Sequence, residues 1–300
     1  MEAATLEQTL REHPDDVGAW LVYGDWLLEQ DDVRGALIQL EHRHARARVA
    51  DRPALQREID ALVKQHQARW RAALPRGVIA KAWKHGFVTK VAVEWTPDAP
   101  RQIERALRER FVTALRILPP DEDEDDDDDE DDDEDDDDDE PRRPPPLEIG
   151  ELAALDLGRL VELDLAYVHL GAAGAKVIAG AASLGGLAAL DLRYAGIGNA
   201  GLAALAASPL ARGLRRLHLQ RNEITSAGAK ALEGFGALVE LDLRYNKIGA
   251  AGAKALLAAP FIGSLARLEL YRKDVSAAGA KELAKSSRLP PALRSYWRSV

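Results

Sequence analysis

Leucines recur through the second half of the chain in a fixed arrangement of hydrophobic and variable positions. Each copy reads leucine, two variable residues, leucine, one variable residue, leucine. The copies begin at Leu160, Leu187, Leu214, Leu238 and Leu265, and the starts are separated by 27, 27, 24 and 27 residues. A glycine column keeps the same register, at Gly174, Gly201, Gly228, Gly252 and Gly279. Two columns in register predict an array of repeats that pack on their neighbours.

The pattern predicts one strand and one helix in each repeat. We expect the fixed leucines to point into the core, the strands to stack in parallel, and the helices to lie behind them. The glycines are expected to open each helix and to let it approach the sheet. The predicted fold class is an α/β solenoid, with parallel strands on the concave side and helices on the convex side, preceded by a small all-α domain.

One repeat is three residues shorter than the others. From Gly228 to Leu238 the chain spans 10 residues where its counterparts span 13. We place this shortening in the loop after the helix. At the other end of the array, residues 289–297 are expected to add a last strand and an aromatic cap.

These repeats resemble the ribonuclease-inhibitor-like class of leucine-rich repeat proteins, which have a full helix in each repeat. The resemblance covers residues 160–288 and extends in weaker form to 80–159. In that class an Asn after the strand bridges the backbones of neighbouring repeats. Here the position is Asn222 or Asn246 in two repeats, but Val168, Ala195 or Lys273 in the others, which predicts an incomplete ladder.

Residues 1–75 show apolar residues at helical spacing and predict an all-α domain. Pro14 interrupts the pattern, and Asp15 or Asp16 can cap the helix that follows it. A third helix is expected from near Asp32, and Pro53 suits the first turn of a fourth.

The run from Trp20 to Gln30, with Asp32, Arg34 and Gly35 after it, resembles the repeat-companion domain of bacterial repeat proteins. The resemblance covers roughly residues 4–45 and implies architecture without chemistry, because that family has no established activity. Trp20, Tyr23 and Trp26 fit a helical core stripe. Asp25 and Arg34 are expected to form a structural ion pair.

Residues 76–120 are interpreted as degenerate opening repeats of the array. Residues 86–93 alternate apolar and polar positions as strands do. A helix is expected after Pro100, and a second parallel strand between Phe111 and Leu118. The array then continues over 147–300 to its C-terminal cap.

The net charge of −10 conceals a strong division, because Asp121 to Glu140 is twenty acidic residues without interruption. The rest of the chain carries about +2 before this run and +8 after it. We expect residues 121–146, acidic and then proline-rich, to form a disordered insertion. It could be solubilising, contact a basic protein, or fold back on the chain's own basic surface. Calcium binding is disfavoured, since the run lacks a glycine turn and a fixed ligand register.

Composition limits the compartment and the chemistry. The chain has no cysteine, which excludes disulfides and thiolate metal sites. Without a signal-peptide pattern or a membrane-spanning apolar run, we expect a soluble cytoplasmic protein with no membrane partner. The Ala, Leu, Arg and Gly content suggests a bacterium with a GC-rich genome.

The variable positions of the strands form three outward columns. The first is Asp164, Asp191, His218, Asp242 and Glu269. The second is Ala166, Arg193, Gln220, Arg244 and Tyr271, and the third is Tyr167, Tyr194, Arg221, Tyr245 and Arg272. Tyr and Arg are enriched where proteins bind each other. Predicted partner-binding residues are therefore Tyr167, Asp191, Arg193, Tyr194, His218, Arg221, Asp242, Arg244, Tyr245, Tyr271 and Arg272. The alternative for the acidic column is a self-satisfied ladder of surface ion pairs.

No phosphate loop, dinucleotide fingerprint, nucleophile elbow or zinc-binding helix motif occurs. We therefore predict no enzyme activity, no catalytic residue, no cofactor and no metal. The leading hypothesis is a non-enzymatic scaffold that binds a protein on the concave face. A regulator of a GTPase, or an inhibitor of a basic enzyme, is one alternative. A nucleic-acid-associated protein is another, disfavoured because basic residues are interspersed with carboxylates.

Overall fold

The computed structural model describes residues 3–120 and 147–299, which divide into two compact units. The first unit comprises Met1–Val93 and Asp98–Arg116, and the second comprises Glu94–Pro97 and Ile117–Val300. The acidic run and the prolines after it lie outside the described residues, so their predicted disorder and roles stay predictions. In the part of the chain that is described, no helix is long and apolar enough to cross a membrane.

The first unit begins with helices only, as predicted. They are α1 (Ala3–Glu12), α2 (Val17–Glu29), α3 (Arg34–Arg46) and α4 (Arg52–Ala72). Asp16 caps α2, because its side-chain oxygen accepts the backbone N–H of Ala19 at 2.9 Å. Pro53 lies in the first turn of α4, where a missing N–H removes no helical hydrogen bond.

A β-hairpin follows these helices, and its first strand is absent from the sequence prediction. Strand β1 (Val78–Lys84) pairs antiparallel with β2 (Phe87–Glu94). The chain turns through His85 and Gly86, whose φ angles of 52° and 77° suit a two-residue hairpin loop. Helix α5 (Ala99–Ala106) and strand β3 (Ala114–Leu118) then appear near their expected places. The interpretation of this region as opening repeats stays a prediction.

Aromatic side chains of α2 lie in the core of the first unit, as predicted. Trp20 is 4% exposed and Tyr23 is fully buried, and both pack with Phe87 and Phe111. The rings of Tyr23 and Phe111 meet edge to face at 5.6 Å. Trp26 is partly buried against the same cluster.

The expected ion pair between Asp25 and Arg34 is wrong. The Arg34 guanidinium instead binds the Asp32 carboxylate, with Nε at 3.0 Å and Nη2 at 2.9 Å. Asp25 accepts a hydrogen bond from Gln39 at 2.8 Å. Asp32 lies only two residues before Arg34, so a local turn closes the pair.

The second unit contains a parallel sheet with its leucines in register. Its strands are β4 (Glu162–Asp164), β5 (Ala189–Asp191), β6 (Arg216–His218), β7 (Glu240–Asp242) and β8 (Arg267–Glu269). Adjacent strands pair through the central leucines Leu163, Leu190, Leu217, Leu241 and Leu268. All fifteen pattern leucines are at most 8% exposed, which confirms that they point inward.

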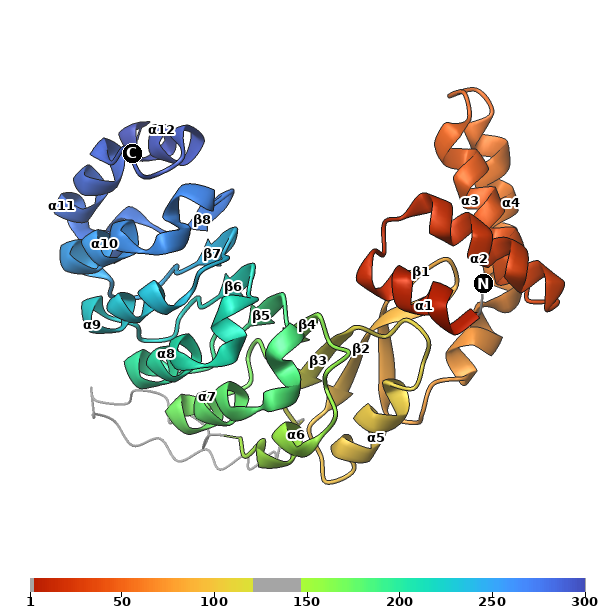
Figure 1. The fold of residues 1–300 in the computed structure, drawn as a ribbon, viewed down its shortest axis with the longest axis horizontal. Coiled ribbons are helices and arrows are strands. Elements are labelled where there is room, and N and C mark those ends of the chain that lie inside the picture. Colours follow the sequence, from red (N-terminus) through yellow and green to blue (C-terminus); the bar gives the residue numbers. More distant parts are fainter. Residues whose placement is uncertain (1–2, 121–146, 300) are drawn as a thin grey trace, which may run out of the picture. The chain divides into compact units, whose positions relative to one another are not determined.

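Helices alternate with these strands and lie on one side of them (Figure 1). The helices of the second unit are α6 (Gly150–Ala154), α7 (Gly171–Gly180), α8 (Gly198–Ala207), α9 (Ser226–Ala229), α10 (Gly249–Ala258), α11 (Arg272–Lys285) and α12 (Pro291–Ser299). Short 3-10 turns follow four of them, at Ala182–Gly186, Pro209–Arg212, Lys230–Gly234 and Pro260–Ser264.

The glycine column lies in the first turn of helices α7, α8 and α10, and not at their first residue as predicted. Helices α7, α8 and α10 begin three residues earlier, at Gly171, Gly198 and Gly249. These residues have φ of 61°, 61° and 64°, a conformation that glycine adopts without strain. A Cβ at Gly201 would lie 2.8 Å from the Cβ of Ala175, and one at Gly279 3.2 Å from that of Ala253. At these two positions glycine therefore lets consecutive helices approach closely. The nearest side chain at Gly174, Gly201, Gly252 and Gly279 is that of the residue four positions earlier in the same repeat.

Two other local expectations are corrected. The 24-residue repeat is shortened in its helix, because α9 has 4 residues where α8 and α10 have 10. Residues 291–299 form helix α12 instead of a last strand. Trp297 on that helix is 4% exposed, so an aromatic side chain is buried at the C-terminal end.

The incomplete asparagine ladder is present as predicted. Asn222 is fully buried and donates from Nδ2 to the Leu192 carbonyl at 2.7 Å. Asn246 donates to the Leu219 carbonyl at 2.8 Å, and its Oδ1 accepts the Asn222 N–H at 3.1 Å. Each side chain thus satisfies backbone groups of the preceding repeat that strands of three residues leave unpaired.

Candidate functional site

The variable positions of the five strands form a surface that we name the strand face. Its first column, the acidic column, consists of Asp164, Asp191, His218, Asp242 and Glu269, and these residues are paired in register. Asp164 is only 5% exposed and Asp242 only 3%. Buried carboxylates need partners, and the partners lie in the same repeats.

In two repeats the carboxylate holds the arginine two residues later. Asp191 accepts the backbone N–H of Arg193 at 3.1 Å, and the guanidinium Nη2 lies 2.7 Å from its Oδ2. Asp242 binds Arg244 in the same way, at 3.0 and 2.7 Å. This forked contact fixes the guanidinium. Hydrogen bonding to the carboxylate raises the pKa of both arginines.

His218 bridges two carboxylates at the third position of the acidic column. Its Nδ1 lies 3.4 Å from Asp191, and its Nε2 lies 3.2 Å from Glu240. The hydrogen bond to Asp191 raises the pKa of His218, against the opposing effect of burial. Burial would raise the pKa of Asp191, but hydrogen bonds from His218 and Arg193 outweigh it and lower that pKa to about 2. The contact therefore favours a charged imidazolium.

Ion pairs also link neighbouring repeats. Arg216 lies 3.3 Å from Glu162, and Arg267 lies 3.2 Å from Glu240 and 3.3 Å from Glu269. The strand face thus contains the ladder of ion pairs that was the alternative interpretation of its charges. The arginine ends of these pairs are half-exposed or more, and such pairs contribute little to stability.

A second group of side chains lies at the carboxyl ends of the strands. We name Tyr167, Tyr194, Arg221 and Tyr245 the tyrosine row. Tyr167 is 55% exposed and Tyr245 43%. The rings of Tyr167 and Tyr194 stack with centroids 4.7 Å apart, and the Arg221 guanidinium lies 5.6 Å from the Tyr194 ring.

The last repeat extends this surface with Tyr271 and a lysine that the sequence prediction missed. The rings of Tyr245 and Tyr271 meet edge to face at 5.1 Å. The Lys273 ammonium lies 4.4 Å from the first ring and 5.5 Å from the second. Lys273 occupies the position that is asparagine in the two ladder repeats. The sequence therefore marks it as a gap in the ladder and not as a surface residue. Arg272, also predicted, is exposed at the start of α11.

The backbone of the tyrosine row has an unusual conformation. Its four residues have φ of 68°, 60°, 53° and 57°, which is rare for bulky side chains and costs about 1 kcal/mol or more for each. Hydrogen bonds to the next repeat hold this conformation. The Tyr167 N–H donates to the Arg193 carbonyl at 2.8 Å, and the Tyr194 N–H to the Gln220 carbonyl at 2.9 Å.

Asp274 completes this backbone ladder where the repeats end. The expected acceptor for the Tyr245 N–H, the Tyr271 carbonyl, instead accepts the N–H of Asp274 within α11. The Asp274 carboxylate takes its place and accepts the N–H groups of Tyr245 at 3.2 Å and Tyr271 at 2.9 Å. Asp274 is 5% exposed, and burial raises its pKa.

The structure divides most of the predicted partner-binding residues into two groups. The ion-pair network contains Asp191, Arg193, His218, Asp242 and Arg244. The aromatic group contains Tyr167, Tyr194, Arg221, Tyr245 and Tyr271. Among the described residues, no cluster of three or more His, Asp or Glu side chains is placed to hold a metal ion.

Comparison with known proteins agrees with this architecture. No curated protein matches the chain. The leucine-rich repeat family matches residues 187–206, 213–232 and 238–257, which cover β5 to α10. Such repeats are generally protein-interaction motifs and typically non-enzymatic. Residues 187–257 of this chain thus contain three leucine-rich repeats.

Proposed function

We propose that the chain is a non-enzymatic scaffold that binds a protein partner through the tyrosine row and the adjoining Tyr271 and Lys273. One observation carries the proposal: Tyr167 and Tyr245 are left 55% and 43% exposed although hydrogen bonds fix their backbone N–H groups. Tyrosine and arginine dominate binding energies at protein interfaces. A surface that is already ordered loses little entropy on binding.

In this proposal the strand face is the concave side of the array. A helix is about 10 Å wide, whereas neighbouring strands are about 4.8 Å apart. Repeats that stack one helix behind each strand therefore curve toward the strands. The extended concave surface suits a partner that spans several repeats.

The acidic column has a supporting role. The carboxylates of Asp191 and Asp242 bind Arg193 and Arg244. Few of their acceptor positions therefore remain for direct contact with a partner. We assign these two aspartates to positioning. The arginines they hold can still present their remaining N–H groups beside the tyrosine row.

The test is a triple variant of the full chain, Tyr167→Ala, Tyr194→Ala and Tyr245→Ala, used to capture proteins from a lysate of the organism that encodes it. We expect at least one protein captured by the wild type to be lost. Tyr296→Ala is the matched control, because Tyr296 is 49% exposed on α12. Arg244 is left intact, since its removal would leave the buried Asp242 carboxylate without its partner. A capture profile identical to that of the wild type would contradict the proposal.

Among the described residues, nothing specific favours the alternative functions. The arginines of the strand face that could contact nucleic-acid phosphates are paired with carboxylates, namely Arg193, Arg216, Arg244 and Arg267. A nucleic-acid surface would gather unpaired basic residues into a patch. The proposed contact of a basic protein with Asp121 to Glu140 involves residues outside those described.

A further inference from the structure

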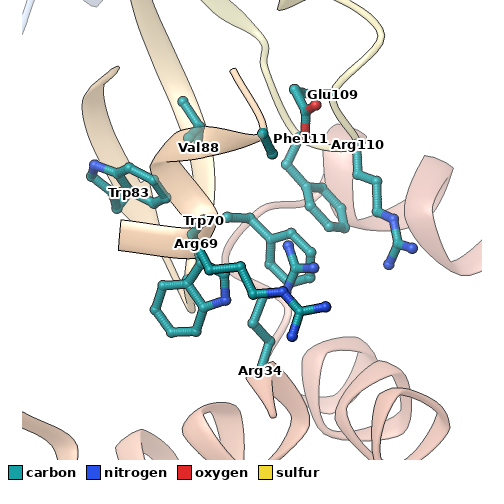
Figure 2. Close-up of a pocket in the computed structure, with 11 residues that line it drawn as sticks. Arg34, Arg69, Trp70, Trp83, Val88, Glu109, Arg110 and Phe111 are labelled. Carbon is teal, nitrogen blue, oxygen red and sulfur yellow. The ribbon is translucent and has the colours of Figure 1, made fainter. Parts of the chain in front are cut away.

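The first unit contains a cavity of about 260 Å³ that combines arginines with aromatic rings. Figure 2 shows Arg34 and Arg69 extending toward the same opening. The lining includes Arg34, Arg69, Arg110, Trp70, Phe87 and Phe111. Its volume is near the lower end for small-molecule sites, which suits a ligand of one ring and one charged group.

Arg34 is held rigidly at this cavity. Asp32 binds its Nε and Nη2, and the guanidinium carbon lies 4.3 Å from the centre of the Phe87 ring. Gly86 has φ of 77°, and a Cβ there would lie 2.9 Å from Arg34 Cγ and 3.0 Å from the Trp70 indole. The glycine thus makes room for both side chains.

Arg69 differs from the other arginines of the cavity. It is exposed near the end of α4, and no ion pair holds it within the described part of the chain. Trp70, the next residue, is 9% exposed. An arginine without a carboxylate partner, beside an ordered one, can donate N–H groups to an incoming anion.

The remaining charged residues of the cavity are an arginine with its own partners and a glutamate. Arg110 lies 3.5 Å from Glu7 and donates to the Tyr23 hydroxyl at 3.0 Å. Glu109 is the acidic lining residue. Since Asp32 binds Arg34 and Glu7 lies beside Arg110, Arg69 is the lining arginine that no carboxylate pairs with in the described part of the chain, and its guanidinium is the group available to an anionic ligand.

We propose that this cavity binds an aromatic phosphate ester. The phosphate lies between the guanidinium groups of Arg69 and Arg34, and the ring packs against the aromatic side chains of the lining. A phosphate has three acceptor oxygens and can satisfy two guanidinium groups, whereas one guanidinium satisfies a carboxylate. Aromatic faces add dispersion and stacking with the ring.

Phenyl phosphate is the first probe, titrated into the full chain by isothermal titration calorimetry at low salt. We expect saturable binding that weakens about tenfold or more in Arg69→Gln, because a hydrogen bond to a charged group is lost. Arg71→Gln is the matched control. It removes an exposed arginine from the same helix that does not line the cavity, and its affinity should equal that of the wild type.

Two further probes separate the parts of the proposal. Inorganic phosphate should bind more weakly than phenyl phosphate, because it has no ring. AMP tests whether the natural ligand is a nucleotide. Binding of AMP supports a nucleotide, whereas binding of phenyl phosphate without binding of AMP supports a smaller phosphate ester with one ring. Absence of phenyl phosphate binding, equal loss in Arg69→Gln and Arg71→Gln, or equal affinity for inorganic phosphate would overturn the proposal.

Discussion

The acidic column and the tyrosine row lie three residues apart in the same repeats, yet their environments are opposite. Asp242 is 3% exposed and its carboxylate is bound by Arg244, whereas Tyr245 is 43% exposed. In the sequence the variable positions look like one surface. In the structure they form two groups: charged residues that are paired with one another, and beside them a row of exposed aromatic side chains. The comparison teaches that residue type alone does not identify a binding residue, because its partners decide whether it is available.

Because of this difference, substitutions in the acidic column and in the tyrosine row should affect different properties of the protein. Removing a buried charge leaves its partner unsatisfied and lowers stability. Removing an exposed side chain usually changes stability by less than about 0.5 kcal/mol. Stability and partner capture should therefore respond to different columns.

The largest expected effect is that of Asp242→Ala. The substitution leaves the Arg244 backbone N–H without its acceptor, and leaves the guanidinium with the more distant Glu269 carboxylate, at 3.8 Å. We expect a loss of about 3 kcal/mol in the free energy of unfolding, measured by urea denaturation. Tyr167→Ala is the comparison and should lose less than about 0.5 kcal/mol. Equal losses in the two variants would remove the distinction between the columns.

A smaller effect is expected for Asp274→Ala. The substitution removes the acceptor for the N–H groups of Tyr245 and Tyr271, which should cost about 2 kcal/mol of stability. Because Tyr245 loses its anchor, partner capture should also weaken although Asp274 itself is buried. Asp274→Asn keeps one side-chain oxygen and should recover part of both losses. An alanine variant as stable as the wild type would show that the carboxylate does not hold the row.

The smallest of these effects concerns His218 and pH. Its folded-state pKa is raised, so its stabilising contribution is complete below the unfolded pKa and is lost as pH rises through the folded value. We expect the wild type to lose up to about 1 kcal/mol more than His218→Gln between about pH 6 and pH 8. Melting temperatures of both proteins across this range provide the check. Parallel curves would mean that His218 contributes nothing to the pH dependence.

The repeat core could be predicted from sequence, because periodic leucines leave only one face for burial. The role of Asn222 and Asn246 was predicted through the resemblance to leucine-rich repeat proteins, in which an asparagine at this position bridges neighbouring backbones. The helix boundaries were harder to predict from the sequence than the core was. A three-residue deletion can shorten either a helix or a loop, and only packing decided that α9 is the shorter element. The role of the glycine column also depended on the neighbouring helix, which sequence spacing does not locate.

The residue types were enough to predict where the surface lies, but not that it divides into an ion-pair network and an aromatic row. Sequence columns place Asp191 and Arg193 side by side without showing that one binds the other. Asp274 was missed because it lies outside the repeat columns and acts only where the array ends. The cavity in the first unit was missed because Arg34, Arg69 and Phe111 are distant in sequence.

Partner binding by the tyrosine row has one decisive test: the triple variant Tyr167→Ala, Tyr194→Ala and Tyr245→Ala, measured on one sample for partner capture and for melting temperature. We expect capture to be lost while the melting temperature stays close to that of Tyr296→Ala. Retained capture at an unchanged melting temperature would contradict the claim that the tyrosine row is the binding surface.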